Sequence, residues 1–426
     1  MPRLIVFALF LGLALGQATW RAGVGGADPW NVGKNPAVAA VRGRWAPPAT
    51  FDLPLGYFGL LALPDRSPLY AFLNEDLYYE HFDLLTAVDQ GASPDALLLN
   101  PARSPKEVVI EVGKDGARVT DASGRPLSAW LARPRSIGQE SDLGYEHPLG
   151  RDLGLGFGLK TKFKTALEPN AALSALLREG RLEANTDYTL TMKSEIDTRL
   201  EAGLAYVIPL PELELEGQRG KLFVGVRGGV FLSLGYLEEK SALTVRTDED
   251  KNVERQTTTT TLFYSLVSEH GPGFGGQFDL GLVWETEEGF VGLGLRDLVR
   301  FYHYRGTELV LTEEGENKRA AQKSGLALGF KPHFGGAWRV PLEGYPAPLL
   351  AVFDLGYDEA PYVHLGGELP VGPLRARAGV GYRDGFSGGL GAGLELGPAR
   401  LDLALTTRQS IVDGHLTFGI AAGVGF

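Results

Sequence analysis

Apolar and polar residues alternate strictly at the C-terminal end of the chain. In the segment 415–426 one set of alternate positions is apolar, and the other holds His415, Thr417 and small residues. The apolar positions are Leu416, Phe418, Ile420, Ala422, Val424 and Phe426. Because successive side chains of a strand point to opposite faces, this pattern predicts a strand with one apolar face. A membrane strand between lipid and a lumen has this pattern, and the alternative is an edge strand of a soluble sandwich.

The same alternation recurs in segments separated by tight turn signals, such as Gly397-Pro398 and Arg383-Asp384-Gly385. It predicts strands at about 151–165, 196–209, 221–236, 274–286, 289–304, 325–340, 347–357, 361–370, 373–383, 386–396, 399–408 and 415–426. Two further strands, at about 50–63 and 141–149, bring the number to about fourteen, within a range of 12–16. We therefore predict an all-β fold, a transmembrane antiparallel β-barrel.

The first residues have the pattern of an export signal. Arg3 precedes an apolar run from Leu4 to Leu15, and small residues follow at Gly16 and Ala18. The run is too short to cross a bilayer as a helix. We expect a signal peptide at 1–18 with a cleavage site near Gly16 or Ala18. The mature protein is then expected in the bacterial outer membrane, and the chain contains no cysteine that could form a disulfide there.

The rest of the chain divides into segments that differ in their pattern of apolar and polar residues. We expect an N-terminal segment at 19–49, a barrel at 50–426, an insertion at 64–140 and an extracellular hairpin loop at 237–273. Within the insertion, apolar residues recur at helical spacing between Leu69 and Val88, and a short hairpin follows around Lys114-Asp115-Gly116. Such a stripe is either a packing face or part of a lid or plug. The Thr257–Thr261 tract fits a hairpin arm, with a glycosylated tract as the alternative.

Composition narrows the function. The mean hydropathy of -0.04 resembles that of a soluble protein, but alternating strands average out in this way. A formal charge of -11 argues against a nucleic-acid partner, which requires a basic face. The seven histidines are scattered, and no nucleophile elbow or phosphate loop is present. We therefore predict a protein that is not an enzyme and that has no cofactor and no metal.

The alternation also assigns charged residues to the lumen. If Leu374, Ala376, Ala378 and Val380 face lipid, the intervening arginines face inward. The same count on neighbouring strands gives Asp354, His364, Glu368, Arg375, Arg377, Glu395, Arg400 and Asp402. Their mixed signs predict an internal ion-pair ladder, because unpaired charges in a confined lumen are costly. The ladder is either a polar conduit or a filling of the barrel. Aromatic residues near strand ends predict an interfacial belt: Phe301, Tyr302, Tyr304, Tyr357, Tyr362, Tyr382 and Phe386.

Three groups of short motifs resemble the long-chain fatty-acid transporter (FadL) superfamily, which includes PorV-type secretion barrels and TraF-like proteins. The first is Gly25-Gly26-Ala27-Asp28-Pro29 followed by Asn35-Pro36-Ala37-Val38-Ala39. The second joins the glycine-rich segment 273–281 to Gly292-Leu293-Gly294-Leu295-Arg296-Asp297-Leu298. The third is the C-terminal series with Asp354-Leu355-Gly356, His364 to Glu368, Arg375 to Gly379, and Gly389 to Gly393.

The resemblance implies a fourteen-stranded barrel with an N-terminal hatch that contains Asn35, Pro36 and Ala37. Pro36 would fix a turn and Asn35 would bind backbone groups, with an ordinary loop start as the alternative. Lys34 stands where the family usually has an aromatic residue. The terminal Phe426 would be the signal that the barrel-assembly machinery reads. The implied function is uptake of hydrophobic small molecules, or else a structural role as a secretion or conjugation accessory barrel. Expected partners are membrane lipid, the assembly machinery and a hydrophobic small molecule, whereas the oligomeric state does not follow from the sequence.

Overall fold

The computed structural model describes residues 15–16, 18–47, 50–53, 55, 96–99, 108–113, 116–121, 134–148, 152–215, 217–358, 360–383, 385–409 and 416–425. Phe426 and most of the insertion 64–140, including the stripe from Leu69 to Val88, lie outside these residues. Among the described residues, eighteen strands join one sheet, and β4 and β5 form a separate two-stranded sheet. The expected all-β, antiparallel architecture is therefore confirmed.

The N-terminal strands are β1 (Leu15–Gly16), β2 (Thr50–Asp52), β3 (Ala96–Leu98), β4 (Val108–Gly113), β5 (Gly116–Asp121), β6 (Arg135–Pro148), β7 (Leu153–Pro169), β8 (Asp187–Leu215), β9 (Gln218–Thr247) and β10 (Val253–Leu266). The C-terminal strands are β11 (Gly273–Glu285), β12 (Gly289–Thr312), β13 (Gly315–Ala327), β14 (Lys331–Val340), β15 (Leu349–Asp358), β16 (Ala360–Val371), β17 (Leu374–Tyr382), β18 (Phe386–Leu396), β19 (Ala399–Gln409) and β20 (Leu416–Gly425). The helices are α2 (Ala18–Gly23), the 3-10 helix η1 (Pro36–Ala40), α3 (Arg42–Trp45), α8 (Ala171–Glu179) and α9 (Val267–His270).

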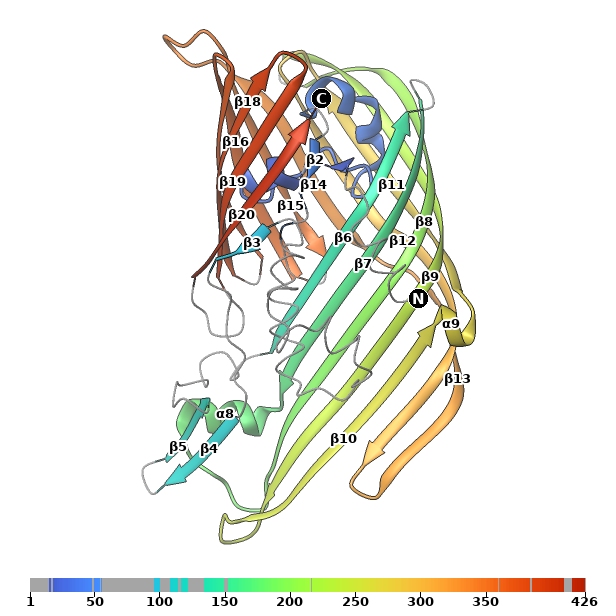
Figure 1. Ribbon diagram of the computed structural model, residues 1–426, viewed down its shortest axis with the longest axis vertical. Helices are drawn as coiled ribbons and strands as arrows, with labels where there is room; N and C mark the ends of the chain where they lie inside the picture. Colours follow the sequence, from blue (N-terminus) through green and yellow to red (C-terminus); the bar gives the residue numbers. More distant parts are fainter. Residues whose placement is uncertain are drawn as a thin grey trace.

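Antiparallel pairing runs without a break from β6 to β20. The order across the sheet is β6, β7, β8, β9, β11, β12, β14 and then β15 to β20. β10 and β13 extend the sheet on one side of the molecule only. β10 lies between β9 and the C-terminal half of β12. β13 pairs with the other edge of the same half of β12. One wall is therefore much taller than the other (Figure 1).

The sheet curls around the N-terminal segment (Figure 1). In the described part of the chain, β6 and β20 are not paired directly with each other. Instead β20 pairs with β2 through Phe51 and Asp52, β2 pairs with β1, and β1 lies beside β6. β3 also pairs with β20. The N-terminal strands thus occupy the space between the two ends of the sheet.

Alternation explains the faces of the C-terminal strands. On β19, Leu401, Leu403 and Leu405 are exposed on the outer face, and Asp402 and Ala404 are buried on the inner face. On β17, Leu374 and Val380 are exposed and Arg377 is buried. Outer apolar side chains and inner polar side chains have the phase that the sequence predicts.

Several boundaries differ from the sequence prediction. β8 spans Asp187–Leu215 and β9 spans Gln218–Thr247, so both are much longer than the predicted strands at 196–209 and 221–236. A single strand at 325–340 is wrong, because β13 ends at Ala327 and β14 begins at Lys331. The strand predicted at 289–304 continues to Thr312 and forms a long hairpin with β13. β6 begins at Arg135, inside the range assigned to the insertion. The loop 237–273 does form a hairpin, with β9 and β10 as its arms.

The hatch, expected at 19–49 and described over residues 19–47, lies inside the curled sheet near the end where the chain terminates (Figure 1). Its apolar side chains form one buried cluster with the wall: Trp20, Val24, Ala27, Trp30, Ala37, Val38, Val41 and Trp45 from the hatch, and Val283, Phe290, Ala337 and Val352 from the strands. The hatch therefore packs on an apolar wall even though Lys34 replaces an aromatic residue. None of the described helices is long and apolar enough to cross a membrane.

Candidate functional site: the hatch and its cationic cavity

One side of the hatch is seated on inward-facing glycines of β9, β11 and β12. Asn35 caps η1 by accepting a hydrogen bond from the Ala37 N–H at 3.1 Å, and its Nδ2 donates to the Leu282 carbonyl at 3.2 Å. A Cβ added at Gly225, Gly281 or Gly294 would overlap hatch atoms of Lys34, Asn35 or Ala37. The wall thus needs glycine here because the hatch backbone lies directly on it. Pro36 is the first residue of η1, where its fixed φ is favourable.

The opposite side of the hatch is seated in the same way on β16, β17 and β18. A Cβ at Gly366 would lie 2.5 Å from the carbonyl oxygen of Val24, and a Cβ at Gly391 would lie 3.0 Å from Cα of Gly23. His364 donates its Nδ1 hydrogen to the Gly25 carbonyl at 2.8 Å. The glycine-rich motifs of the sequence therefore form two glycine tracks, one on β9, β11 and β12 and one on β16, β17 and β18, and the hatch backbone packs directly on both.

Lys34 connects the hatch to the wall by an ion pair, which we call the latch. Its Nζ lies 2.6 Å from Oδ2 of Asp354, a fully buried carboxylate on β15. The same oxygen accepts the Asp28 N–H at 3.1 Å, and His333 lies 3.0 Å from Oδ1. Burial is the largest single influence and would lower the pKa of Lys34, but the electrostatic interactions with Asp354, Tyr362 and Asp28 and the hydrogen bond to Asp354 together outweigh it, so the pKa lies above its ordinary value. Lys34 is therefore a cation in the folded protein.

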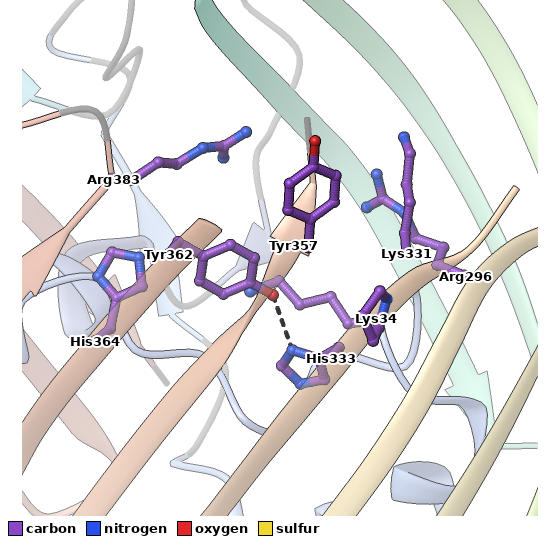
Figure 2. A pocket seen from close by; sticks show the side chains of 9 residues that line it. Lys34, Arg296, Lys331, His333, Tyr357, Tyr362, His364 and Arg383 are labelled. Atoms are coloured by element: carbon purple, nitrogen blue, oxygen red, sulfur yellow. Dashed lines mark hydrogen bonds between the residues drawn. The ribbon is translucent and has the colours of Figure 1, made fainter. Parts of the chain in front are cut away.

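A small cavity of about 60 Å³ lies next to the latch. It is lined by Lys34, Arg296, Lys331, Pro332, His333, Tyr357, Tyr362, His364 and Arg383. Figure 2 shows Arg383 on one side of Tyr357 and the cations Lys331 and Arg296 on the other. The Tyr362 hydroxyl and His333 Nδ1 are 2.9 Å apart, and Lys34 Nζ lies 5.1 Å from the centre of the Tyr362 ring. Cations and aromatic rings thus surround the cavity, and such a lining suits an anionic group with an apolar body.

The residues assigned to the lumen ladder fall into three groups. Arg377 binds both Glu368 at 2.7 Å and Asp402 at 2.6 Å, and Arg400 binds Asp402 at 2.8 Å. Trp20 of the hatch donates to Glu368 at 2.7 Å. Arg375, near the start of β17, and Glu395, near the end of β18, form a separate ion pair with Nη2 and Oε2 3.0 Å apart.

Asp354 and His364 form the third group. Like Glu368, both bind the hatch, through Lys34 and Gly25 respectively. Among the described residues, the ladder residues are therefore divided into the Arg377 network, the Arg375–Glu395 pair, and Asp354 with His364. Phe426 lies outside the described residues.

A second network on the opposite wall was not singled out from the sequence. Arg227 joins Glu201 at 2.6 Å to Asp279 at 3.1 Å, and Asp279 accepts the Asp297 N–H at 2.8 Å. Arg199 continues it from Glu201 to Asp197. Asp197, Arg199 and Glu201 occupy alternate positions of one strand, so the alternation that found the ladder contained the signal for this network as well.

The predicted aromatic belt is only partly correct. Phe301, Tyr357, Tyr382 and Phe386 are exposed, whereas Tyr304 is buried. Tyr304 stacks on Tyr236 with ring centres 4.3 Å apart, and its hydroxyl donates to Asp197 at 3.3 Å. Tyr362 faces the cationic cavity. These two rings are inside because their strand positions share the parity of the lumen residues.

An apolar depression lies on the outer face instead of beside the hatch. It is lined by Leu155, Ala202, Gly203, Leu204, Gly228, Gly229, Val230, Gln277, Phe278, Val299 and Phe301. Within the described ranges, no group of three or more His, Asp or Glu side chains is arranged to hold a metal ion.

No family model matches the chain, and no curated protein matches it. A structural match links it to the crystal structure of the Pseudomonas putida toluene transporter TodX, with 12% identity, a TM-score of 0.25, and coverage of 68% of this chain and 69% of that one. Function is argued below from the contacts of this chain, because a match at this level carries none of that argument. The resemblance to the long-chain fatty-acid transporter superfamily therefore rests on the short motifs of the sequence.

Proposed function

We propose that the chain is an outer-membrane β-barrel that takes up hydrophobic small molecules, with the hatch as its gate. The finer part of the proposal is that the transported molecules carry an acidic head group. The observation that carries it is the double position of Lys34. This residue belongs to the hatch, is ion-paired to Asp354 of the wall, and lines the cationic cavity.

A ligand bound in the cavity can affect the hatch because the latch, the Lys34–Asp354 ion pair, lies beside the cavity. An anion beside Arg383 and Lys331 lies near Lys34 and competes with Asp354 for its charge. Buried carboxylate–ammonium pairs lose much of their stabilisation when one partner is diverted. Weakening this pair removes one of the two contacts through which Asp354 holds the hatch segment between Asp28 and Lys34, the other being the Asp28 N–H.

The outer surface supports placement in a membrane. Large apolar side chains are exposed along the outer faces of β8, β9, β11, β12 and β14 to β20, including Leu232, Phe274, Leu365, Leu390 and Leu403. A contiguous apolar band of this kind is stable against lipid and unstable against water.

The test uses one ligand in two forms, a fluorescent long-chain fatty acid and its methyl ester, with the purified protein in detergent. We expect the acid to bind more tightly than the ester, and Arg383→Gln to weaken only the acid. Arg255→Gln, an exposed position on β10, is the matched control. Equal binding of acid and ester would refute the head-group assignment, and absence of uptake of either into proteoliposomes would refute transport.

A second candidate is a non-transporting accessory barrel of the PorV or TraF-like type, which serves secretion or conjugation. The ion-pair networks on both inner walls favour it, since they fill the lumen and hold it closed. Such a barrel needs a protein partner, and the tall hairpin of β9 and β10 is the surface most available for one. Co-purification of an outer-membrane or secretion partner, lost on trimming 237–273, together with absence of fatty-acid binding, selects this alternative.

A further inference from the structure

Thr19, near the start of the hatch, is anchored through its backbone nitrogen to a buried carboxylate. The Thr19 N–H donates to Oδ1 of Asp52 at 3.0 Å. Thr19 is 0% exposed and Asp52 is 1% exposed. Asp52 ends β2, which pairs with the last strand through Asp52 and Gly423. This contact therefore ties the start of the hatch to the C-terminal strand.

The same residue follows the small residues that end the expected signal peptide. Signal-peptide cleavage sites have small residues at the first and third positions before the cut. Gly16 and Ala18 fill these positions for a cut between Ala18 and Thr19. Ala14 and Gly16 fill them for a cut before Gln17, so spacing alone leaves two sites.

We propose that the chain is cut between Ala18 and Thr19, and that the new terminal ammonium of Thr19 forms a buried ion pair with Asp52. A signal peptidase hydrolyses the amide with one water, leaving a carboxylate on Ala18 and an ammonium group on Thr19. The nitrogen that gains the charge already lies 3.0 Å from Asp52 Oδ1, so the pair forms without movement of the hatch.

The choice between the two sites follows from the burial of Asp52. Hydrogen bonds between a cation and a carboxylate are about twice as strong as neutral ones, so a charged Thr19 nitrogen would bind Asp52 more tightly than an amide does. A cut before Gln17 would leave the Thr19 nitrogen a neutral amide. A cut before Thr19 supplies a cation on the atom that faces the carboxylate.

Processing would therefore complete the docking of the hatch. Cleavage removes β1 together with the leader, so the pairing of β1 with β2 is lost. The new charge strengthens the contact that remains between the hatch and β2. Removal of the leader and fixation of the gate become one event, with the mature terminus buried inside the barrel.

The first experiment is N-terminal sequencing and intact mass of the protein purified from outer membranes. We expect the chain to begin at Thr19. A chain that begins at Gln17 or that retains the leader overturns the proposal. Ala18→Leu should block this cut and accumulate the precursor or shift the site, whereas unchanged processing of this variant contradicts it.

The second experiment measures reductive methylation of the terminal amine in the folded protein, by mass spectrometry. The amine should react slowly in the wild type. Because a neighbouring opposite charge shifts a pKa by about 1–3 units, Asp52→Asn should speed the reaction about tenfold or more. The control is Asp250→Asn at the exposed hairpin tip, which should leave the rate unchanged. Equal rates in Asp52→Asn and wild type would overturn the ion pair even if the cleavage site were correct.

Discussion

Replacing Gly366 by alanine should unseat the hatch, whereas the same change at Gly228 should not. A Cβ at Gly366 would lie 2.5 Å from the Val24 carbonyl oxygen and 2.7 Å from its Cβ. Ordinary contact begins at 3.4 Å, so the Val24 backbone has to retreat by the difference, about 0.9 Å. Val24 is fully buried between the walls, and overpacking of this kind costs about 1–3 kcal/mol.

Gly228 is the matched control because an added Cβ there meets no atom within 4 Å. It lies on the outer face of β9 in the same sheet, and alanine in place of glycine lowers the conformational entropy of the unfolded chain, which stabilises a protein by about 0.4–1 kcal/mol. Gly228→Ala should therefore be neutral or slightly stabilising.

The assay is trypsin cleavage within the hatch at Arg42 and Arg44, together with release of a small dye from proteoliposomes. We expect faster cleavage and faster release in Gly366→Ala, with a heat-modifiable gel band that shows an intact barrel. If both glycine variants behave like the wild type, the hatch is not seated on the glycine track and the reasoning is wrong.

Three further predictions concern the wall, the latch and assembly. Phe418→Arg on the outer face of β20 should destabilise the protein in lipid vesicles by about 2–4 kcal/mol in urea unfolding, and Phe418→Leu should not; equal stability would invert our assignment of the faces. The pKa of Lys34 is raised in the folded protein, so the latch should give its full stabilisation below the unfolded pKa of 10.5 and lose it as the pH rises through the folded pKa. Cleavage of the hatch should therefore accelerate only in strong alkali. In Lys34→Met, which has no latch to lose, this acceleration should be much smaller. Deleting Phe426 should lower the amount of assembled barrel in outer membranes without changing the stability of the protein that does assemble.

The C-terminal strands were predictable because each repeats a short alternation that ends in a tight turn. β18 (Phe386–Leu396) and β19 (Ala399–Gln409) match their predicted bounds to within one residue. β10 was predicted only as an arm of the 237–273 hairpin, and β13 was missed, since the residues of β13 are mostly polar on both faces and carry no alternation of hydropathy. Their pairing with β12 depends on strands that the rest of the fold supplies.

The site was less predictable, because its main contact joins residues 320 positions apart. The sequence marked Lys34 as a departure from the family pattern and marked Asp354 as an inward charge. Nothing in the strand periodicity brings the two together, because the hatch has no regular period. Asp354 was therefore expected to pair with neighbouring strands. The glycine motifs were visible from the start, but their use as a seat for the hatch backbone needs the tertiary contacts of Val24 and Asn35.

The central claim is that the hatch must leave its seat for a molecule to pass, and a reversible tether tests it most directly. Gly23 and Gly391 lie against each other, since a Cβ on either would lie about 3 Å from Cα of the other, and the hatch has to shift by a few tenths of an ångström to accept two cysteine side chains. The chain has no cysteine of its own, so Gly23→Cys with Gly391→Cys gives a single bridge. We predict that uptake of fluorescent fatty acid into proteoliposomes stops when the cysteine pair is oxidised and resumes when it is reduced. Oxidation and reduction should leave uptake by each single variant unchanged. Equal uptake by the oxidised and reduced double variant would contradict the account.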